Sequence, residues 1–344
     1  MVKRLLVFIL LILTCLFCLT ACDLFVTIFS MSPFPAYLSQ AVASVDMRDD
    51  IEKFLGDDYS DWESDVYVLR NSTREQVFLV VRRNPGPQMV YVFDTKLNLE
   101  VSHRADTHRR IGLVEALNDN FVVGGVQFNY ADLTPMNPPE DPYPPISEDT
   151  WQKHTFAHGG RNYIVWSDPN QLSCSEYDPN WGLLSNGYAP ITLNEDCRLA
   201  GLGYEPDLVD PILGAGITPV YLLVYCREWE SDRGFLYIVR TVASEYPNPA
   251  VSVNLVTDGL LNGRTSSRVR DVEDRRPALY TRKGVVVEAR NRGTFRLVSL
   301  EGDVVKSFYI TSDERTPFDF DIDGKYYYVF NRTTLRLYKA ETGF

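Results

Sequence analysis

Three aspartates of this sequence have the spacing with which a calcium-binding loop begins, Asp319-x-Asp321-x-Asp323-Gly324. Carboxylate oxygens suit a hard divalent cation, and a bidentate glutamate at the twelfth position normally completes such a loop. Phe330 occupies that position here. Because apolar residues alternate with the aspartates, the segment also fits a strand with one apolar side that turns at Asp323-Gly324. We predict the strand and the turn, and no metal site.

No other set of residues defines a reaction. Beyond residue 22, the histidines and cysteines form neither a His-Glu-x-x-His motif nor a Cys-x-x-Cys zinc pattern, and the chain has no Gly-x-Ser-x-Gly elbow or phosphate loop. A glycosidase needs two converging carboxylates, but spacing cannot select a pair among 46 acidic residues. We therefore expect no resident cofactor.

Two segments have a composition that suits partner binding. The formal net charge of −12 argues against nucleic-acid binding, yet residues 264–296 are rich in Arg and Lys. Residues 135–145 contain six prolines and are expected to form a stiff loop outside the sheets. The basic segment fits solvated turns, or an edge for anionic lipid, acidic glycan or a partner protein. Its candidate binding residues are Arg264, Arg268, Arg270, Arg275 and Arg276.

The N-terminus has the layout of an export signal. Lys3 and Arg4 precede the uncharged apolar stretch 5–19, which is typical of a secretory signal peptide. The stretch is shorter than the roughly 20 residues of a membrane-spanning helix. Lengthening it through residues 24–31 would place Asp23 in the membrane at a cost of a few kcal/mol.

The signal ends in Leu19-Thr20-Ala21-Cys22. All four positions resemble the lipobox of bacterial lipoprotein precursors, which reads Leu, a small residue, Ala or Gly, then Cys. The resemblance implies cleavage before Cys22, diacylglyceryl modification of its thiol and acylation of its new amino group. It predicts a signal peptide over 1–21, a lipidated tether over 22–35, and a lipid anchor in a membrane of the bacterial cell envelope, on its periplasmic or outer-surface side.

Three cysteines remain after Cys22. Cys174 and Cys197 flank a loop-rich segment and are the expected disulfide pair in an oxidising compartment. Two free thiols are the alternative. Cys226 lies in an apolar run and is expected to be a buried small hydrophobic residue.

Six pairs of strand-like runs follow one another, each rich in β-branched and aromatic residues and separated by turn residues. They are 75–81 with 89–95, 120–125 with 126–133, 161–168 with the run to 177, 219–226 with 234–242, 284–290 with 294–300, and 325–330 with 335–341. Antiparallel pairs that recur every 40 to 64 residues or so indicate β-propeller blades. We predict an all-β propeller of about six four-stranded blades over 56–344, with two β-sandwich domains as the alternative.

One or two short helices are predicted within 36–55, from apolar residues at intervals of three and four. Segments 90–101 and 335–343 resemble blade ends of quinoprotein-type and WD-type propellers, although the quinoprotein Trp has no match. The expected role is a non-enzymatic platform that binds a ligand, protein or glycan at a membrane. The alternatives are a propeller glycoside hydrolase or lyase acting on an extracellular polymer, and a quinone-holding redox propeller.

Overall fold

The computed structural model of the protein describes a little over half of the chain, mainly its strands. The described residues are 36–56, 61–70, 74–83, 86–105, 114–117, 120–123, 126–129, 132–136, 151–158, 161–168, 171–178, 183–192, 197–204, 219–228, 233–242, 252–262, 278–288, 294–310 and 316–343.

These residues form six four-stranded antiparallel sheets, numbered here as blades 1 to 6. Blade 1 contains β2 (Trp62–Arg70), β3 (Glu75–Arg83), β4 (Gln88–Asp94) and β5 (Leu99–Ala105). Blade 2 contains β6 (Val114–Leu117), β7 (Asn120–Val123), β8 (Val126–Asn129) and β9 (Pro135–Met136). Blade 3 contains β10 (Trp151–His158), β11 (Arg161–Asp168), β12 (Gln171–Tyr177) and β13 (Leu183–Thr192).

The other three sheets continue the same order along the chain, except that the last one ends with the first strand. Blade 4 contains β14 (Cys197–Tyr204), β15 (Pro219–Glu228), β16 (Arg233–Val242) and β17 (Ser252–Asn262). Blade 5 contains β18 (Ala278–Thr281), β19 (Gly284–Glu288), β20 (Thr294–Val298) and β21 (Val304–Tyr309). Blade 6 contains β22 (Phe318–Phe320), β23 (Tyr326–Asn331), β24 (Arg336–Glu341) and β1 (Ala41–Asp46).

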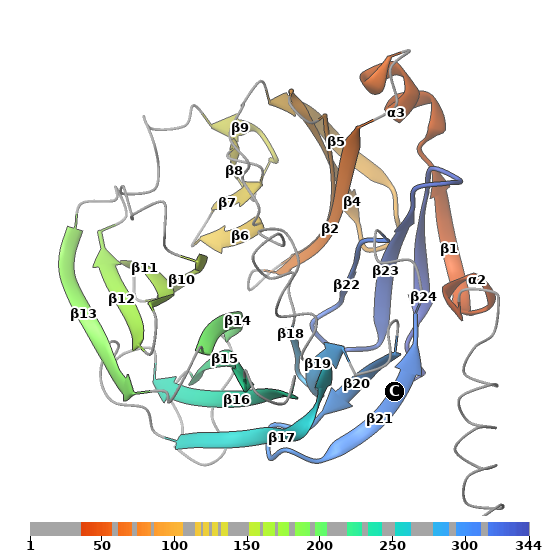
Figure 1. Cartoon of the computed structure of the whole chain (residues 1–344). Coiled ribbons are helices and arrows are strands. Elements are labelled where there is room, and N and C mark those ends of the chain that lie inside the picture. The colour runs from red at the N-terminus through yellow and green to blue at the C-terminus, as the bar shows by residue number, and fades with distance from the viewer. Residues whose placement is uncertain are drawn as a thin grey trace, which may run out of the picture.

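The sheets are arranged in a closed ring (Figure 1). The first strand of each blade is innermost, and each inner strand contacts the next in the order β2, β6, β10, β14, β18, β22 and back to β2. The chain is therefore a β-propeller, and the prediction of that fold class is confirmed. Two consecutive β-sandwiches would have no reason to bring β22 against β2.

The six predicted hairpins are the second and third strands of the six blades. These middle strands are covered on both faces by neighbouring blades, so they carry consecutive apolar residues instead of alternating ones. In blade 1, every residue of 77–81 and of 90–93 is buried, and in blade 5 the same holds for Val285, Val286 and Val287.

The prediction of one or two short helices within 36–55 is confirmed, but the strand that lies between the two helices was not predicted. Helices α2 (Ala36–Gln40) and α3 (Arg48–Leu55) are present, but residues 41–46 between them form strand β1, the outer strand of blade 6. The local spacing of apolar residues suggested helix, whereas pairing with β24 decided the outcome. Residues of β24 lie almost 300 positions away in sequence, so no local pattern reports that pairing.

The proline-rich segment also differs from the prediction at its start. Pro135 and Met136 form β9, the edge strand of blade 2, opposite Phe128 and Gln127. An outermost strand tolerates proline because one of its sides has no ladder partner to satisfy. Residues 137–145 lie outside the described part of the chain.

The core lies between blades. One cluster of buried side chains joins blade 6, blade 1 and α3, and it includes Phe330, Leu79 and Ile51, all three fully buried. A second cluster joins blades 5 and 6 and takes in Tyr37 of α2. The two helices, one at each end of β1, thus pack on blade 6 and cover parts of both clusters.

A glycine is required where blades 4 and 5 meet. A Cβ atom on Gly203 of β14 would lie 2.3 Å from the ring of Tyr280 in β18. That ring stacks on Tyr221 of β15, with 5.4 Å between the ring centroids. The absence of a side chain at residue 203 lets the two inner strands approach each other.

Within the part of the chain that the structure describes, neither helix has the length and apolar character needed to cross a bilayer.

Candidate functional site

Several residues singled out in the sequence lie outside the described part of the chain. They are Cys22 and the five basic-edge residues Arg264, Arg268, Arg270, Arg275 and Arg276. The lipid anchor and the basic edge stay predictions.

The cysteines that were expected to form a disulfide lie in different blades. Cys174 is in β12 of blade 3, and Cys197 is the first residue of β14 in blade 4. The backbone register sets Cys197 directly opposite Cys226 of β15. The pairing of Cys174 with Cys197 stays a prediction, and Cys226 is a second candidate partner for Cys197.

The aspartate motif forms a strand and a turn, as predicted. Asp319 lies in β22, and Asp321 begins the tight turn into β23, where Gly324 has a φ of 65°. Both aspartates are buried. Among the described residues, no group of three or more acidic, His or Cys side chains is arranged to hold a metal ion.

The carboxylate of Asp319 binds backbone amides. It accepts hydrogen bonds from the N–H groups of Val68, at 2.8 Å, and of Phe320, at 2.9 Å. Val68 belongs to β2, so Asp319 connects blade 6 to blade 1. An inner strand has no neighbour within its own sheet on the side of the ring axis, and a carboxylate from the next blade supplies an acceptor there.

Asp321 stabilises the turn of its own blade. Its carboxylate accepts a hydrogen bond from the N–H of Tyr326 at 2.9 Å. Burial raises the pKa of Asp321, while the amides of Tyr326 and Lys325 partly oppose that rise. The carboxylate therefore holds the turn at a cost in desolvation.

The peptide of Ile322 links three blades at the same end of the inner strands. Its N–H donates to Glu75 of blade 1 at 3.0 Å, and its carbonyl accepts from the N–H of Arg282 in blade 5 at 2.8 Å. The Arg282 guanidinium also pairs with the exposed carboxylate of Asp323 at 2.8 Å. We refer to Glu75, Arg282, Asp319, Asp321 and Ile322 as the inner seam.

A second set of contacts fastens blade 6 to the β4–β5 turn of blade 1. The carbonyl of Thr95 accepts hydrogen bonds from the Tyr328 hydroxyl at 3.3 Å and from Lys339 Nζ at 2.8 Å. The Lys339 ammonium lies 4.0 Å from the centroid of the Tyr326 ring, which adds a cation–π contact. Burial is the largest cause of a raised pKa at Tyr328.

Blade 6 contacts blade 1 through an aromatic pair as well. The ring of Trp62, the first residue of β2, meets Phe330 edge-on with 6.4 Å between centroids. The Arg332 guanidinium lies 4.2 Å from the Trp62 ring centroid and donates a hydrogen bond to the Trp62 carbonyl. The junction between the last and the first blade is therefore closed by charge, hydrogen bonds and aromatic packing together.

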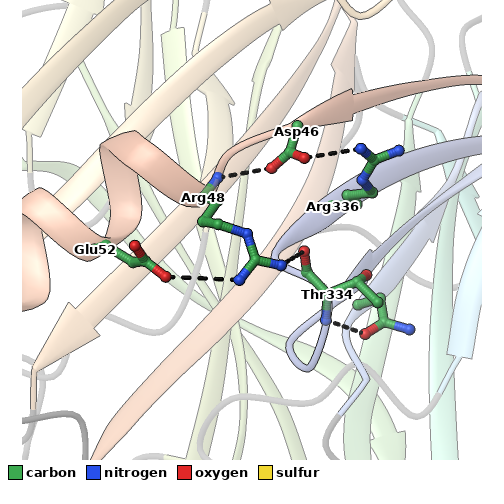
Figure 2. Close-up of polar contacts among 6 residues, drawn as sticks. Asp46, Arg48, Glu52, Thr334 and Arg336 are labelled. Atoms are coloured by element: carbon green, nitrogen blue, oxygen red, sulfur yellow. Dashed lines mark hydrogen bonds and ion pairs between the residues drawn. The ribbon is translucent and has the colours of Figure 1, made fainter.

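The end of β1 is held by charged side chains (Figure 2). Asp46 accepts hydrogen bonds from the N–H of Arg48, at 3.1 Å, and from the Arg336 guanidinium, at 2.8 Å. Arg48 reaches the carbonyl of Thr334 in the β23–β24 turn at 3.4 Å, and its other amino group lies 3.7 Å from Glu52. These contacts fix α3 to the β23–β24 turn of blade 6.

Replacing Asp46 with Asn is expected to make the protein less stable at neutral pH but not in acid. The N–H of Arg48 first, and then the Arg336 guanidinium, lower the pKa of Asp46. Its carboxylate therefore contributes stability above the ordinary value of 3.8, and the contribution disappears as the pH falls through the lowered pKa. Unfolding midpoints in urea, measured from pH 7 to pH 2, would show this.

Arg336→Gln is the companion variant for this test. It should remove only part of the pH-dependent difference, because the backbone amide of Arg48 remains. The effect is small in either variant, since the group is exposed. A constant difference between Asp46→Asn and wild type across the pH range would contradict the assignment.

Sequence reasoning found the strand and turn of the inner seam but missed its partners. The aspartates were visible as a motif, whereas Val68 and Glu75 are about 250 positions away from the groups they bind. Arg48, Asp46 and Arg336 were not singled out either. Their meeting depends on the pairing of β1 with β24, which was not predicted.

No family model matches the sequence, and no curated protein matches it. Among solved structures, the chain is similar to the β-propeller domain of Cps50 (Swd1) from Myceliophteria thermophila, with 9% identity and a TM-score of 0.43 over 81% of this chain and 96% of that one. It is also similar to the WD40 domain of SCAP from fission yeast, with 9% identity and a TM-score of 0.36 over 84% and 76% of the two chains.

A third similar structure is a GH62 hydrolase in complex with xylotriose, with 13% identity and a TM-score of 0.34 over 73% of this chain and 69% of that one. A fold does not by itself establish a function. The function must therefore be argued from the residues of this chain.

Proposed function

We propose that the protein is an exported bacterial lipoprotein whose β-propeller is a non-enzymatic platform for a ligand or protein partner at a membrane surface. The observation that carries the proposal is Leu19-Thr20-Ala21-Cys22 at the end of an apolar signal sequence. Two or three acyl chains on Cys22 would give stable membrane attachment, which one chain does not.

The way the chain enters the propeller supports a peripheral anchor. Ala36 begins α2, and the strand that follows is the outermost strand of blade 6 (Figure 1). A tether attached there leaves the ends of the inner strands, and the turns around them, accessible to a partner.

The contacts of the inner seam favour the platform hypothesis over the enzyme hypothesis. A glycoside hydrolase needs two carboxylates that converge on its substrate. Asp319, Asp321 and Glu75 come from two blades, but each accepts a hydrogen bond from a backbone amide. These three side chains therefore have a structural task that accounts for their positions.

Replacing Cys22 with Ala tests the anchor. In the producing bacterium, wild type should incorporate labelled fatty acid and fractionate with membranes. Cys22→Ala should lose the label completely and accumulate as the longer precursor, because the modified thiol is absent. The matched control is Cys18→Ala, which removes a cysteine from the same signal sequence and should behave as wild type.

Labelling of Cys22→Ala at the wild-type level would refute the lipoprotein proposal.

The platform is tested separately, by incubating the purified protein with cell-envelope polysaccharides and measuring new reducing ends. Release of reducing ends that is lost in Asp321→Asn, while the fold is retained, would favour a glycoside hydrolase instead.

A further inference from the structure

We propose that the outer edge of blades 5 and 6 rests on the lipid bilayer that holds the anchor, through Leu38, Val42, Val304 and Val305. We call these four residues the apolar edge. The inference rests on the proposed anchor at Cys22, and it adds the orientation of the propeller on the membrane.

The four side chains are large, apolar and exposed. Their exposed fractions are 43% for Leu38, 54% for Val42, 46% for Val304 and 58% for Val305. Scattered apolar residues are ordinary on a protein surface, whereas a contiguous group indicates an interaction site. What matters is therefore whether these four residues form one surface.

Two β-bulges turn valines out of the edge. In β1, Ala41 pairs with Ala340 and Ala43 with Lys339, so Val42 is the extra residue. A bulge re-aims a side chain and ends regular pairing, which also protects an edge strand from adding another strand.

The same irregularity occurs in the outer strand of the neighbouring blade. In β21, Lys306 pairs with Leu297 and Val304 with Val298, so Val305 is the extra residue. Charged or polar side chains would protect either edge equally well. Valine at both bulges instead suits an apolar environment.

Contacts around the C-terminus connect the two strands. Lys306, beside Val305, donates a hydrogen bond to the carbonyl of Gly343 at 2.6 Å. Gly343 follows β24, and Ala340 of β24 pairs with Ala41, beside Val42. The apolar edge therefore runs from β21 past the end of β24 to β1.

The helix α2 lies on the same side of the ring. Tyr37, next to Leu38, is buried in one cluster with Ile310, which follows β21, and Phe308 of β21 packs against that cluster. Figure 1 shows α2, β1 and β21 together along one side of the propeller.

The chain before α2 identifies the bilayer as the occupant. Residues 24–35 read Leu-Phe-Val-Thr-Ile-Phe-Ser-Met-Ser-Pro-Phe-Pro and carry no charge. From Cys22 to Ala36 the chain spans at most about 50 Å. Apolar side chains of this kind gain free energy by leaving water for the membrane interface, so the tether brings Leu38 toward the surface that holds the acyl chains.

The net charge of the chain does not attract it to an anionic bilayer. The net charge is −12, and it becomes more negative once Lys3 and Arg4 are removed with the signal peptide. An acidic protein is repelled by anionic headgroups over about a Debye length. Contact through the apolar edge would therefore not depend on net charge, and the basic segment 264–296 stays a separate prediction.

Blade 3 supplies an internal control. Leu183 and Leu184, in its outer strand β13, are exposed to a similar degree as the apolar edge. Blade 3 lies across the ring from blade 6 (Figure 1). A bilayer that contacts β1 and β21 cannot also contact β13.

Amide hydrogen exchange on the lipidated, full-length mature protein tests the orientation. The protein is measured in vesicles of phosphatidylethanolamine and phosphatidylglycerol, and a chain that begins at Asp23, which lacks the signal peptide and the lipidated cysteine, is measured without vesicles. Peptides that cover residues 38–42 and 304–305 should exchange severalfold more slowly in the vesicles. Peptides of β13 and of the turn around Thr333 should not change.

The double variant Val42→Asp, Val305→Asp should lose this protection while keeping its acyl chains. Leu183→Asp, Leu184→Asp is the matched control and should keep the protection. Protection of β13 in place of β1 and β21, or no protection at any of them in the lipidated protein, would overturn the orientation. A failure of the anchor itself is recognised independently, by the missing acyl mass on the N-terminal peptide.

The backbone register of β14 and β15 supports a second inference, which concerns the cysteines. We infer that Cys197 forms a disulfide with Cys226, its cross-strand partner, and not with Cys174. Paired residues of antiparallel strands have Cα atoms about 4.5–5.5 Å apart, within the range of about 4.4–6.8 Å that a disulfide spans. Cys174 is in a different sheet, where the register sets it opposite Val165 and Gly187.

The reaction is a thiol–disulfide exchange. The thiols of Cys197 and Cys226 together lose two protons and two electrons and form one S–S bond, and a disulfide oxidant is reduced to two thiols. In the laboratory, oxidised glutathione serves as that oxidant, so the test does not depend on export.

Peptide mapping distinguishes the two pairings. The purified protein is equilibrated with reduced and oxidised glutathione, alkylated without reduction and digested. The expected result is one linked pair of peptides containing Cys197 and Cys226, with Cys174 alkylated. Cys174→Ser should leave the link intact, and Cys226→Ser should leave Cys197 alkylated. A link between Cys174 and Cys197, or alkylation of all three cysteines, would overturn the inference.

Discussion

A chain that begins at Met47, and so lacks α2 and β1, is expected to lose the cooperative unfolding transition of the propeller. The truncation removes the outer strand of blade 6 and the buried side chain of Tyr37. Burial of a large apolar side chain contributes about 2–3 kcal/mol, and each hydrogen bond of the β1–β24 ladder adds about 1 kcal/mol. Their sum is comparable with the whole stability of an ordinary domain, about 5–15 kcal/mol.

The control is a chain that begins at Ala36, which lacks the signal peptide and the tether but keeps β1. It should unfold in one transition, with near-ultraviolet circular dichroism and urea titration as the measurements. A peptide of residues 36–46 added to the shorter chain should restore part of the transition, because β24 would accept an added strand along the edge that the truncation exposes. Equal urea unfolding midpoints for the two chains would show that the stability of the propeller does not depend on β1.

The fold could be predicted from the sequence wherever the pattern is local. The middle strands of each blade are contiguous apolar runs with a turn between them, as in 75–81 and 89–95, and these appear as hairpins in the structure. The repeated spacing of the hairpins then indicated a propeller. β1 was missed because six residues are too few for a strand pattern to be distinguished from a helical one, and because β24 lies at the other end of the chain.

The candidate site divides in the same way. The alternation around Asp319 and the turn at Gly324 could be predicted, since both are properties of a short segment. The function of the Asp319 carboxylate could not, because the donor it binds, the N–H of Val68, comes from the first blade. Only the closed ring brings these two groups together.

Asp319→Ala is expected to destabilise the protein by about 2–3 kcal/mol, the cost of losing hydrogen bonds to a charged acceptor and leaving a donor unpaired. Asp319→Asn should cost less than Asp319→Ala. Its amide has one oxygen, so it can accept from the N–H of Val68 or of Phe320 but presents an NH₂ group to the other. Urea titrations at pH 7 give the three free energies of unfolding.

Asp323→Ala is the matched control, because it removes an aspartate of the same motif from the far side of the turn. Its carboxylate is 61% exposed and pairs with Arg282 at the surface. An exposed pair contributes about 0–1 kcal/mol, so the predicted order of destabilisation is Asp319→Ala, then Asp319→Asn, then Asp323→Ala.

Whether Asp319→Ala lowers or raises the free energy of unfolding also bears on function. Residues that serve catalysis are often kept at a cost in stability, so their removal leaves stability unchanged or raises it. A carboxylate whose purpose is to join blade 6 to blade 1 must instead lower stability when it is removed. An unchanged or increased free energy of unfolding in Asp319→Ala would contradict the structural role and would reopen the hydrolase hypothesis for the inner seam. A loss of about 2–3 kcal/mol in Asp319→Ala, with smaller losses in Asp319→Asn and Asp323→Ala, would support the structural role of the Asp319 carboxylate.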